Sequence, residues 1–253
     1  MNQAKAAIVT GGAVRLGKAI AISLAQKGYD ILIHYNSSSG PAEETATEIR
    51  SIGVKCTTIQ TNLSDYEQVT KLIATAKEIY PHLSLLVNSA SGYTQARISE
   101  TTEEIFDTQF GLNIKAPFFL AKAFKESINT GSIVNIIDNK SGFNQYQYAA
   151  YLLGKKSLLE FTKMAAREFA PEVRVNAVSP GVVLPAKTRS VEYIDWRVQA
   201  IPLKRMGSPM DIGAAVCFFA ENEFVTGQHI AIDGGENIAQ IGLNAGEYDQ
   251  TKI

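Results

Sequence analysis

Short apolar runs rich in β-branched residues alternate along this chain with longer segments in which apolar residues recur at helical spacing. This alternation is typical of βαβ units, in which helices cover the faces of a parallel sheet. The predicted strands are Ala6–Thr10, Ile31–Tyr35, Lys55–Gln60, Leu83–Asn88, Ser132–Asp138, Arg174–Ser179 and His229–Asp233. The predicted helices are Leu16–Lys27, Glu43–Ser51, Tyr66–Ile79, Glu103–Ser127, Tyr151–Phe169 and Met210–Ala220. We therefore expect an α/β fold, a doubly wound (Rossmann) seven-stranded parallel sheet flanked by helices.

No repeat or low-complexity linker divides the 253 residues, so a single domain over residues 1–253 is expected. Two segments lack the alternating pattern. Residues 184–205 follow a Pro-Gly turn, contain two further prolines and have weak periodicity, which predicts a mobile substrate loop over a pocket. Residues 236–253 have no strong period and are predicted to form a C-terminal arm or tail.

Charge and composition argue against several classes of protein. The formal net charge is −1, so there is no basic excess for binding nucleic acid or an anionic membrane surface. The longest apolar run, residues 212–220, is far shorter than the ~20 residues of a membrane span, and the apolar stretch near the N-terminus is too short for a signal peptide. The histidines and cysteines show no metal-ligand spacing. We therefore expect a cytoplasmic protein with buried cysteines and no metal site.

A glycine-rich turn, Thr10-Gly11-Gly12-Ala13-Val14-Arg15-Leu16-Gly17, joins the first predicted strand to the first predicted helix. Free backbone N–H groups and the positive end of a helix dipole make such a turn a natural site for a pyrophosphate. The strict GxGxxG spacing is absent, and a Gly-Gly turn also forms without a ligand. The turn alone therefore leaves both interpretations open.

The end of the second predicted strand bears on the choice of cofactor. An NAD-specific protein carries an acidic residue there for the ribose hydroxyls. At this place the chain has Tyr35, Asn36, Ser37 and Ser38. Arg15 in the glycine-rich turn supplies a positive charge instead, and this combination suits the 2′-phosphate of NADPH. We therefore predict that the cofactor is NADP(H).

Tyr151 and Lys155 lie four residues apart, on one face of the helix that follows the fifth predicted strand. A phenol with a pKa of ~10 exchanges protons poorly near neutral pH unless that pKa falls. An ammonium group ~4 Å away, in an effective dielectric of ~20, contributes about 4 kcal/mol. We therefore expect Lys155 to lower the pKa of Tyr151 toward neutrality.

Together with further motifs, in order and at suitable spacing, these residues resemble the short-chain dehydrogenase/reductase family through about Gly235. The matching segments are the glycine-rich turn, Asn88-Ser89-Ala90, Gly111-Leu112-Asn113-Ile114-Lys115-Ala116-Pro117, Tyr151 with Lys155, Pro180-Gly181, and Thr226-Gly227-Gln228 through Asp233-Gly234-Gly235. The resemblance implies that Lys155 also holds the nicotinamide ribose, that Asn113 orders a proton-relay water, and that the backbone of Val183 fixes the carboxamide. It also implies a homotetramer, which fits the broad apolar surface of the predicted helix Glu103–Ser127. The residues predicted to bind NADP(H) are Gly11, Arg15, Leu16, Tyr35, Asn36, Ser37, Ser38, Asn62, Leu63, Asn88, Ala90, Ser91, Tyr151, Lys155, Pro180, Gly181 and Val183.

The chain departs from the usual family pattern at several positions. Arg15 stands where glycine is common, Asn62 where an aspartate is expected, and Ser89 where an asparagine is expected. Asp138 stands thirteen residues before the tyrosine, where most members have serine. Ser141, three residues further on, is a second candidate for the serine role, and Asp138 could merely cap the end of a strand.

These departures resemble one branch of the family, the pteridine reductases, which reduce pterin or dihydrofolate-type rings with NADPH. The segments that carry this resemblance are Arg15-Leu16-Gly17, His34-Tyr35, Asn88-Ser89-Ala90-Ser91-Gly92-Tyr93, residues 113–120, and Asp138 with Tyr151 and Lys155. The resemblance implies the catalytic residues Asp138, Tyr151, Lys155 and Asn113. It implies the substrate-binding residues Arg15, Ser91, Tyr93, Asp138 and Tyr151.

Two other functions stay open at this stage. A ketone or 3-ketoacyl-carrier-protein reductase would share the same scaffold, because few residues separate the two activities. A nucleotide-sensing regulator would keep the fold without turnover, although the chain retains both Tyr151 and Lys155. In each case the expected partner is a small molecule rather than a nucleic acid or a membrane.

Overall fold

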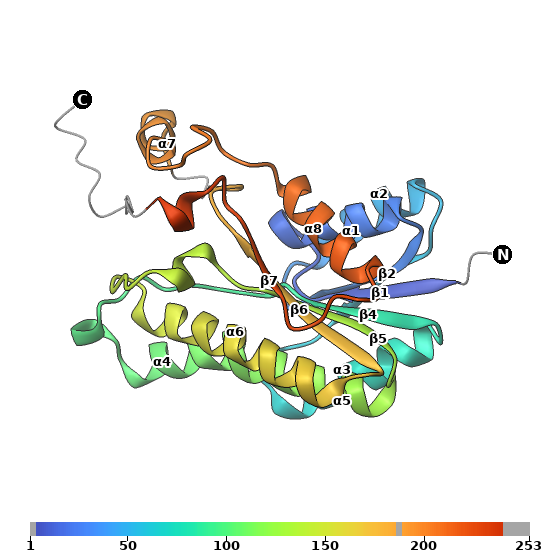
Figure 1. Cartoon of the computed structure of the whole chain (residues 1–253). Coiled ribbons are helices and arrows are strands. Elements are labelled where there is room, and N and C mark those ends of the chain that lie inside the picture. The colour runs from blue at the N-terminus through green and yellow to red at the C-terminus, as the bar shows by residue number, and fades with distance from the viewer. Residues whose placement is uncertain (1–3, 186–188, 240–253) are drawn as a thin grey trace.

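A parallel sheet in the order β3-β2-β1-β4-β5-β6-β7 forms the centre of the molecule (Figure 1). The computed structural model describes residues 4–185 and 189–239. Its strands are β1 (Lys5–Val9), β2 (Tyr29–Tyr35), β3 (Cys56–Gln60), β4 (Leu83–Asn88), β5 (Gly131–Ile136), β6 (Val173–Pro180) and β7 (His229–Ile232). The strand order reverses between β1 and β4, and a crevice for ligands is expected at the carboxyl ends of the strands at such a point. The predicted doubly wound fold is confirmed.

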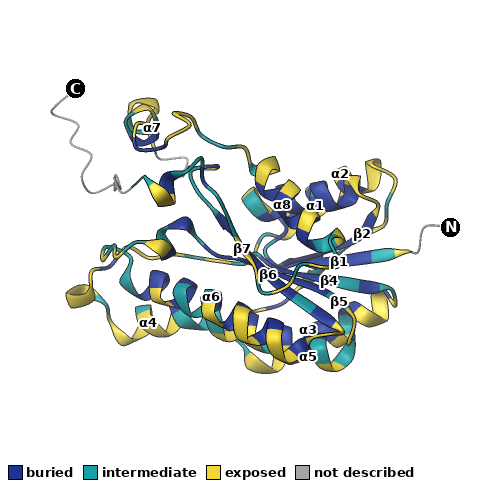
Figure 2. Ribbon diagram, viewed as in Figure 1, coloured by how far each residue is buried: buried dark blue, intermediate teal, exposed yellow. Residues whose placement is uncertain are grey.

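Helices cover both faces of this sheet (Figure 1). The helices are α1 (Arg15–Gln26), α2 (Ser39–Ser51), α3 (Tyr66–Ile79), α4 (Glu103–Phe110), α5 (Ala116–Ser127), α6 (Ala149–Phe169), α7 (Val191–Val198) and α8 (Pro209–Glu221). One apolar core lies between the sheet and α3, α5 and α6, and a second lies between the sheet and α1, α2 and α8. In β1, Ile8 enters the first core and Val9 the second, because successive side chains of a strand point to opposite faces. The strands are therefore buried on both sides (Figure 2).

The sequence located the strands well. All seven predicted strands are present in the described residues, and their ends differ by at most two positions. Helix α2 begins at Ser39 rather than at Glu43, since Pro41 is tolerated within the first turn of a helix. Among the described helices, none combines the length and the apolarity needed to cross a membrane.

The segment Glu103–Ser127, predicted as one helix, is divided by a π-helical turn at Gly111–Lys115. This turn separates α4 from α5 and contains Asn113, whose side chain is fully buried. Single π-helical turns inside helices are rare and frequent at functional sites. The prediction was correct in its overall span but missed the interruption.

Two segments predicted to be irregular are partly ordered. Residues 184–205 contain α7, which begins after Ser190, whose hydroxyl accepts a hydrogen bond from Tyr193 N–H at 3.2 Å. At the C-terminal end, Glu236–Ile238 form a 3₁₀ turn, η4, and the Glu236 side chain is fully buried. The prediction of an arm or tail is therefore wrong where this segment begins, and its remainder, residues 240–253, lies outside the described residues.

Candidate active site

A cleft of about 540 Å³ opens beside the glycine-rich turn at the carboxyl ends of the central strands. The residues predicted to bind NADP(H) that line it are Gly11, Arg15, Leu16, Asn36, Asn62, Leu63, Ala90, Ser91, Tyr151, Lys155, Pro180, Gly181 and Val183. The predicted residues that do not line it are Tyr35, Ser37, Ser38 and Asn88. Asn88 is instead buried, and its Nδ2 donates to Asn135 Oδ1 at 2.9 Å, which joins β4 to β5. Lining residues that were not among those predicted to bind NADP(H) or the substrate are Val14, Gly17, His34, Ser64, Ser89, Leu112, Ile136, Ile137 and Leu184.

The glycine-rich turn is held in place by neighbouring strand ends. Gly11 has a φ of +64°, and a Cβ there would lie 2.9 Å from the Cα of Ala90, so no side chain fits. The Gly11 N–H donates to Nδ1 of His34 at 3.1 Å. Burial lowers the pKa of His34, and because Nδ1 accepts, the neutral ring donates through Nε2 to Thr61 O at 2.9 Å. His34 is therefore a support for the turn that sequence analysis missed.

Arg15 connects this cleft to the segment predicted as the substrate loop. Its backbone is left-handed, with a φ of +53°, a conformation that costs residues other than glycine about 1–2 kcal/mol. Glycine adopts this conformation easily, which explains why glycine is common at this position in the short-chain dehydrogenase/reductase family that the sequence resembles. The exposed Arg15 side chain donates from Nη2 to Leu184 O at 2.8 Å. Its positive charge therefore lies at the edge of the 540 Å³ cleft, called the cofactor cleft below.

Asp138, Tyr151 and Lys155 meet in the wall of the cleft. The Tyr151 hydroxyl donates to Asp138 Oδ2 at 2.8 Å, and Asp138 Oδ1 accepts from Lys140 N–H at 2.8 Å. Asp138 follows β5 and caps the 3₁₀ turn η3 (Asn139–Gly142). Asp138 therefore both caps η3 and accepts a hydrogen bond from Tyr151. Ser141, the other candidate for the serine role, is buried and lines neither this cleft nor the cavity next to it.

Burial and then the charge of Asp138 raise the pKa of Tyr151 well above its usual value. The expectation that Lys155 lowers this pKa is wrong, because Lys155 Nζ lies 5.9 Å from the Tyr151 ring centroid and donates to Ile136 O at 2.8 Å. Burial lowers the pKa of Lys155 to about 8, against the opposing charge of Asp138. Burial also raises the pKa of Asp138, although hydrogen bonds from Lys140 N–H and from Tyr151 oppose that change. Tyr151 therefore stays protonated near neutral pH, and its hydroxyl proton is directed at Asp138.

Asn113 lies in the π-helical turn behind the cleft. Its Nδ2 donates to Gln109 O at 3.0 Å and to Gly92 O at 3.2 Å, and its Oδ1 accepts from Ser91 Oγ at 2.8 Å. In a regular α-helix the carbonyl of Gln109 would accept a hydrogen bond from the backbone N–H of Asn113. In this π-helical turn the carbonyl accepts from the side-chain amide of Asn113 instead. Asn113 reaches the cleft only through Ser91, which lines it.

A second cavity of about 270 Å³ adjoins the first beyond Tyr151. Tyr93 stands at the boundary of the two cavities and is 60% exposed. Its ring centroid lies 5.5 Å from that of Tyr148 and 5.8 Å from that of Tyr151. Aromatic rings therefore line one side of this cavity.

Three of the predicted substrate-binding residues, Tyr93, Asp138 and Tyr151, line both cavities. Arg15 and Ser91 line only the cofactor cleft. Polar and aromatic lining residues that sequence analysis missed are Asn139, Lys140, Gln145, Tyr148, Arg189, Tyr193 and Arg197. Tyr148 could have been inferred, since it precedes Tyr151 by three residues at the start of α6, whereas nothing in the local sequence pattern marks Arg197.

The side chains that could support metal or thiol chemistry are dispersed or buried in the described part of the chain. There, no group of three or more histidine, cysteine, aspartate or glutamate side chains is arranged to hold a metal ion. Cys56 and Cys217 are free and buried, and burial raises their thiol pKa values to about 12 and about 11. Neither thiol is therefore a ready nucleophile near neutral pH.

Comparisons with known proteins find relatives that match over most of the chain. The model of the family described as enoyl-(acyl carrier protein) reductase matches residues 12–237. The 3-oxoacyl-[acyl-carrier-protein] reductase FabG of Staphylococcus aureus is 31% identical over 243 residues, which cover 93% of this chain and 99% of that protein. An uncharacterized oxidoreductase of Mycobacterium tuberculosis is 32% identical over 250 residues, which cover 94% of each chain.

Among solved structures, the FolM alternative dihydrofolate reductase 1 from Brucella suis, in complex with NADP, is 33% identical to this chain. The two superimpose with a TM-score of 0.87 over 92% of this chain and 95% of that one. A putative short-chain alcohol dehydrogenase from Sinorhizobium meliloti is 29% identical, with a TM-score of 0.86. The similarity therefore extends over nearly the whole chain.

Proposed function

Since this chain belongs to the short-chain dehydrogenase/reductase family, we propose that it is an NADPH-dependent reductase of a pterin or dihydrofolate-type ring. The family assignment makes it an oxidoreductase, and NADP(H) is its cofactor. The substrate is our inference. The hydrogen bond from Tyr151 to Asp138, at the junction of the two cavities, is the observation that carries it.

The residues of the first cleft fit NADP(H). Gly11 allows the pyrophosphate to approach the backbone, since a Cβ there would meet Ala90. Arg15 and Asn36 line the end of the cleft expected to receive the 2′-phosphate. Among the described residues that line the cleft, the only carboxylate is Asp138, which is placed beside Tyr151 and not at this end. When bound, the cofactor supplies a hydride.

The proton chemistry of Asp138 favours a C=N bond over a ketone. Reduction of a ketone develops negative charge on oxygen, which needs a hydrogen-bond donor, and an ionised carboxylate cannot donate. Losing one such donor typically costs about 10²–10³ in rate. A ring nitrogen instead needs a proton, which the hydrogen-bonded pair of Asp138 and Tyr151 can deliver, while the carboxylate also accepts from ring N–H groups.

Positioning roles follow from the two cavities. Tyr93 would offer a flat aromatic face to the substrate ring, and stacking of this kind contributes about 0.5–1.5 kcal/mol. Lys155 would hold the nicotinamide ribose, and Asn113 would act through Ser91 and an ordered water. Residues 184–205 would cover the substrate, because Val183 and Leu184 line both cavities and α7 follows in the same segment.

The test is consumption of NADPH by the purified protein with dihydrofolate, dihydrobiopterin, dihydromonapterin and acetoacetyl esters as alternative acceptors. Turnover of at least one reduced pterin is expected. The relatives named for 3-oxoacyl reduction favour a second candidate, a ketone or 3-ketoacyl-carrier-protein reductase. Oxidation of NADPH with any of these acceptors would reject the hypothesis that the protein is a nucleotide-sensing regulator without turnover.

Replacing Arg15 with glutamate is expected to erode the preference for NADPH over NADH. A hydrogen bond to a charged group contributes about 1.5–3 kcal/mol, which corresponds to a preference of about 10- to 150-fold in the wild type. The measurement is kcat/KM for each cofactor. Lys27→Glu is the matched control, because it makes the same charge change on the exposed residue that follows α1. Equal kcat/KM values for the two cofactors in the wild type would refute the role of Arg15.

We further propose a homotetramer. Phe106 on α4 and Phe118 on α5 are 41% and 43% exposed, and they lie on the helices that the π-helical turn connects. Large apolar side chains left exposed on a folded chain are often covered at an interface between subunits. Light scattering should give four times the chain mass of 27.5 kDa, and a monomer at micromolar concentration would contradict the proposal.

A further inference from the structure

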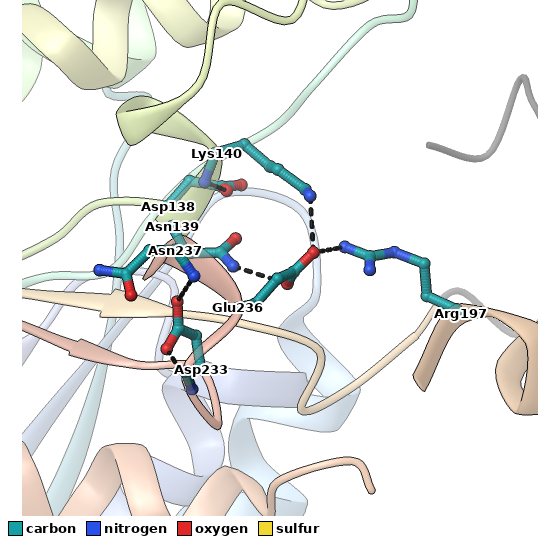
Figure 3. A network of polar contacts seen from close by, with 8 residues as sticks. Asp138, Asn139, Lys140, Arg197, Asp233, Glu236 and Asn237 are labelled. Atoms are coloured by element: carbon teal, nitrogen blue, oxygen red, sulfur yellow. Dashed lines mark hydrogen bonds and ion pairs between the residues drawn. The ribbon is translucent and has the colours of Figure 1, made fainter. Parts of the chain in front are cut away.

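A buried carboxylate, Glu236, is surrounded by side chains from two other parts of the chain (Figure 3). Its Oε1 accepts from Lys140 Nζ at 2.6 Å and also from Arg197 Nη2. Its Oε2 accepts from Asn139 Nδ2 at 2.7 Å. Glu236 itself lines neither the cofactor cleft nor the substrate cavity.

The segment that carries Glu236 is fixed to the end of the sheet. Asp233, directly after β7, accepts from Gly235 N–H at 3.0 Å through Oδ1 and from Asn237 N–H at 2.8 Å through Oδ2. Gly235, which directly precedes η4, has a left-handed backbone with a φ of +88°. The carboxylate of Glu236 therefore extends from a turn that is hydrogen-bonded to Asp233 at the end of β7.

The first side chains held by Glu236 belong to the turn that orients Asp138. Asn139 and Lys140 directly follow Asp138, and the Lys140 N–H donates to Asp138 Oδ1 at 2.8 Å. Both side chains of this turn end on Glu236 (Figure 3). Glu236 is therefore connected to Asp138 through the two residues that directly follow it.

The other side chain held by Glu236 belongs to the predicted substrate loop. Arg197 lies near the end of α7, is 5% exposed and lines the substrate cavity. α7 otherwise stands away from the sheet (Figure 1). The ion pair with Glu236 therefore connects α7 to the same carboxylate that Asn139 and Lys140 contact.

We infer that Glu236 is a positioning residue, which holds Asp138 through η3 and holds α7 over the substrate cavity. This inference rests on the proposed function, in which Asp138 takes part in proton delivery. Although burial opposes ionisation of Glu236, the hydrogen bond from Lys140 and the charges of Lys140 and Arg197 keep its pKa below the usual value. The carboxylate is therefore ionised near neutral pH, and it pairs with the buried Arg197 and the partly buried Lys140.

The test is the kinetics of Glu236→Gln, which keeps the size of the side chain and removes its charge. We expect kcat to fall by up to about 100-fold, because displacement of a catalytic group by about 1 Å has an effect of that order. We also expect a higher KM for the pterin, since α7 loses its anchor, and an unchanged Kd for NADPH. Lys140→Met removes the ion pair of Glu236 with η3 and keeps its contact with Arg197 on α7. This variant should therefore lower kcat more than it raises KM.

Two controls make the outcome decisive. Glu221→Gln removes an exposed carboxylate that pairs with Lys5 and should leave kcat and KM as in the wild type. A purely structural role would lower the Tm of Glu236→Gln and leave kcat and KM of the folded enzyme unchanged, and that result would overturn the inference. If Glu236→Gln does not fold, Lys140→Met decides alone, because Lys140 keeps 17% of its side chain exposed and unaltered kcat there refutes the link to Asp138.

The proposed function can fail separately. If the wild type reduces only acetoacetyl esters, the pterin assignment is wrong, and the same variants then test the positioning role with that acceptor. If none of these acceptors supports oxidation of NADPH by the wild type, both the proposed function and the positioning role of Glu236 are rejected.

Discussion

Asp138→Asn is expected to abolish reduction of the pterin while leaving the affinity for NADPH nearly unchanged. Asparagine keeps the shape of the side chain and can still accept from Lys140 N–H, so η3 should stay folded. It cannot take up and pass on a proton, and loss of general acid–base catalysis lowers rates by about 10²- to 10⁴-fold. The measurements are kcat with a dihydropterin and the Kd of NADPH by fluorescence titration.

The control for this substitution is Glu78→Gln, the same change from carboxylate to amide at an exposed position on α3. It should behave as the wild type in both measurements. Retention of more than about a tenth of the wild-type kcat in Asp138→Asn would show that the aspartate does not take part in proton delivery, since the expected loss is at least about 10²-fold.

Gly17→Ala is expected to weaken NADPH binding and to destabilise the protein together. A Cβ at this position would lie 2.1 Å from the carbonyl oxygen of Gly11 and 2.8 Å from its carbonyl carbon. Because both are backbone atoms of the cofactor turn, the turn itself must move. Overpacking of this kind costs about 1–3 kcal/mol, which corresponds to about 5- to 150-fold in affinity if the cost falls on the bound state.

Gly40→Ala is the matched control for Gly17→Ala. Gly40 lies in α2, and a Cβ there would meet no atom within 4 Å. Alanine inside a helix is more stable than glycine by about 0.5–1 kcal/mol, so this variant should gain stability and bind NADPH as the wild type does. Wild-type NADPH affinity and Tm in Gly17→Ala would show that the turn is not constrained as the structure indicates.

Strand positions were predictable from the sequence because this sheet is covered on both faces. Every strand then needs apolar residues on both sides, and runs such as Ala6–Val9 are apolar throughout and easily recognised. The glycine-rich turn and the pair of Tyr151 and Lys155 were predictable for a different reason. Their chemistry requires particular residue types at a fixed local spacing, which one sequence displays.

The parts that the sequence did not reveal depend on contacts between distant segments. The π-helical turn arises where the Asn113 side chain bonds to the Gln109 carbonyl and to Ser91, and no periodicity of apolar residues encodes that. Helix α7 is short, and Arg197 near its end is anchored by Glu236, which lies 39 residues further along the chain. Glu236 lies in a segment that is polar and irregular in sequence, yet its side chain is fully buried.

The pKa of Tyr151 illustrates the limit of pairwise reasoning. A calculation from one ammonium group predicts a lowered pKa, because it counts only the attraction between Lys155 and a phenolate. The structure adds the loss of solvent and the negative charge of Asp138, and both act in the other direction. The result is a tyrosine that stays protonated near neutral pH, with its hydroxyl hydrogen-bonded to Asp138.

The central claim is that Asp138 with Tyr151 protonates a ring nitrogen rather than a carbonyl oxygen. Its most direct test is the ratio of kcat/KM for a dihydropterin to that for an acetoacetyl ester, measured with NADPH in the wild type and in Asp138→Ser. We expect the wild type to favour the pterin, and the serine variant to shift the ratio toward the ester by about 10²-fold or more, because a hydroxyl restores the missing donor. A wild type that is active on the ester and inactive on every reduced pterin would contradict the claim, as would a ratio that Asp138→Ser leaves unchanged.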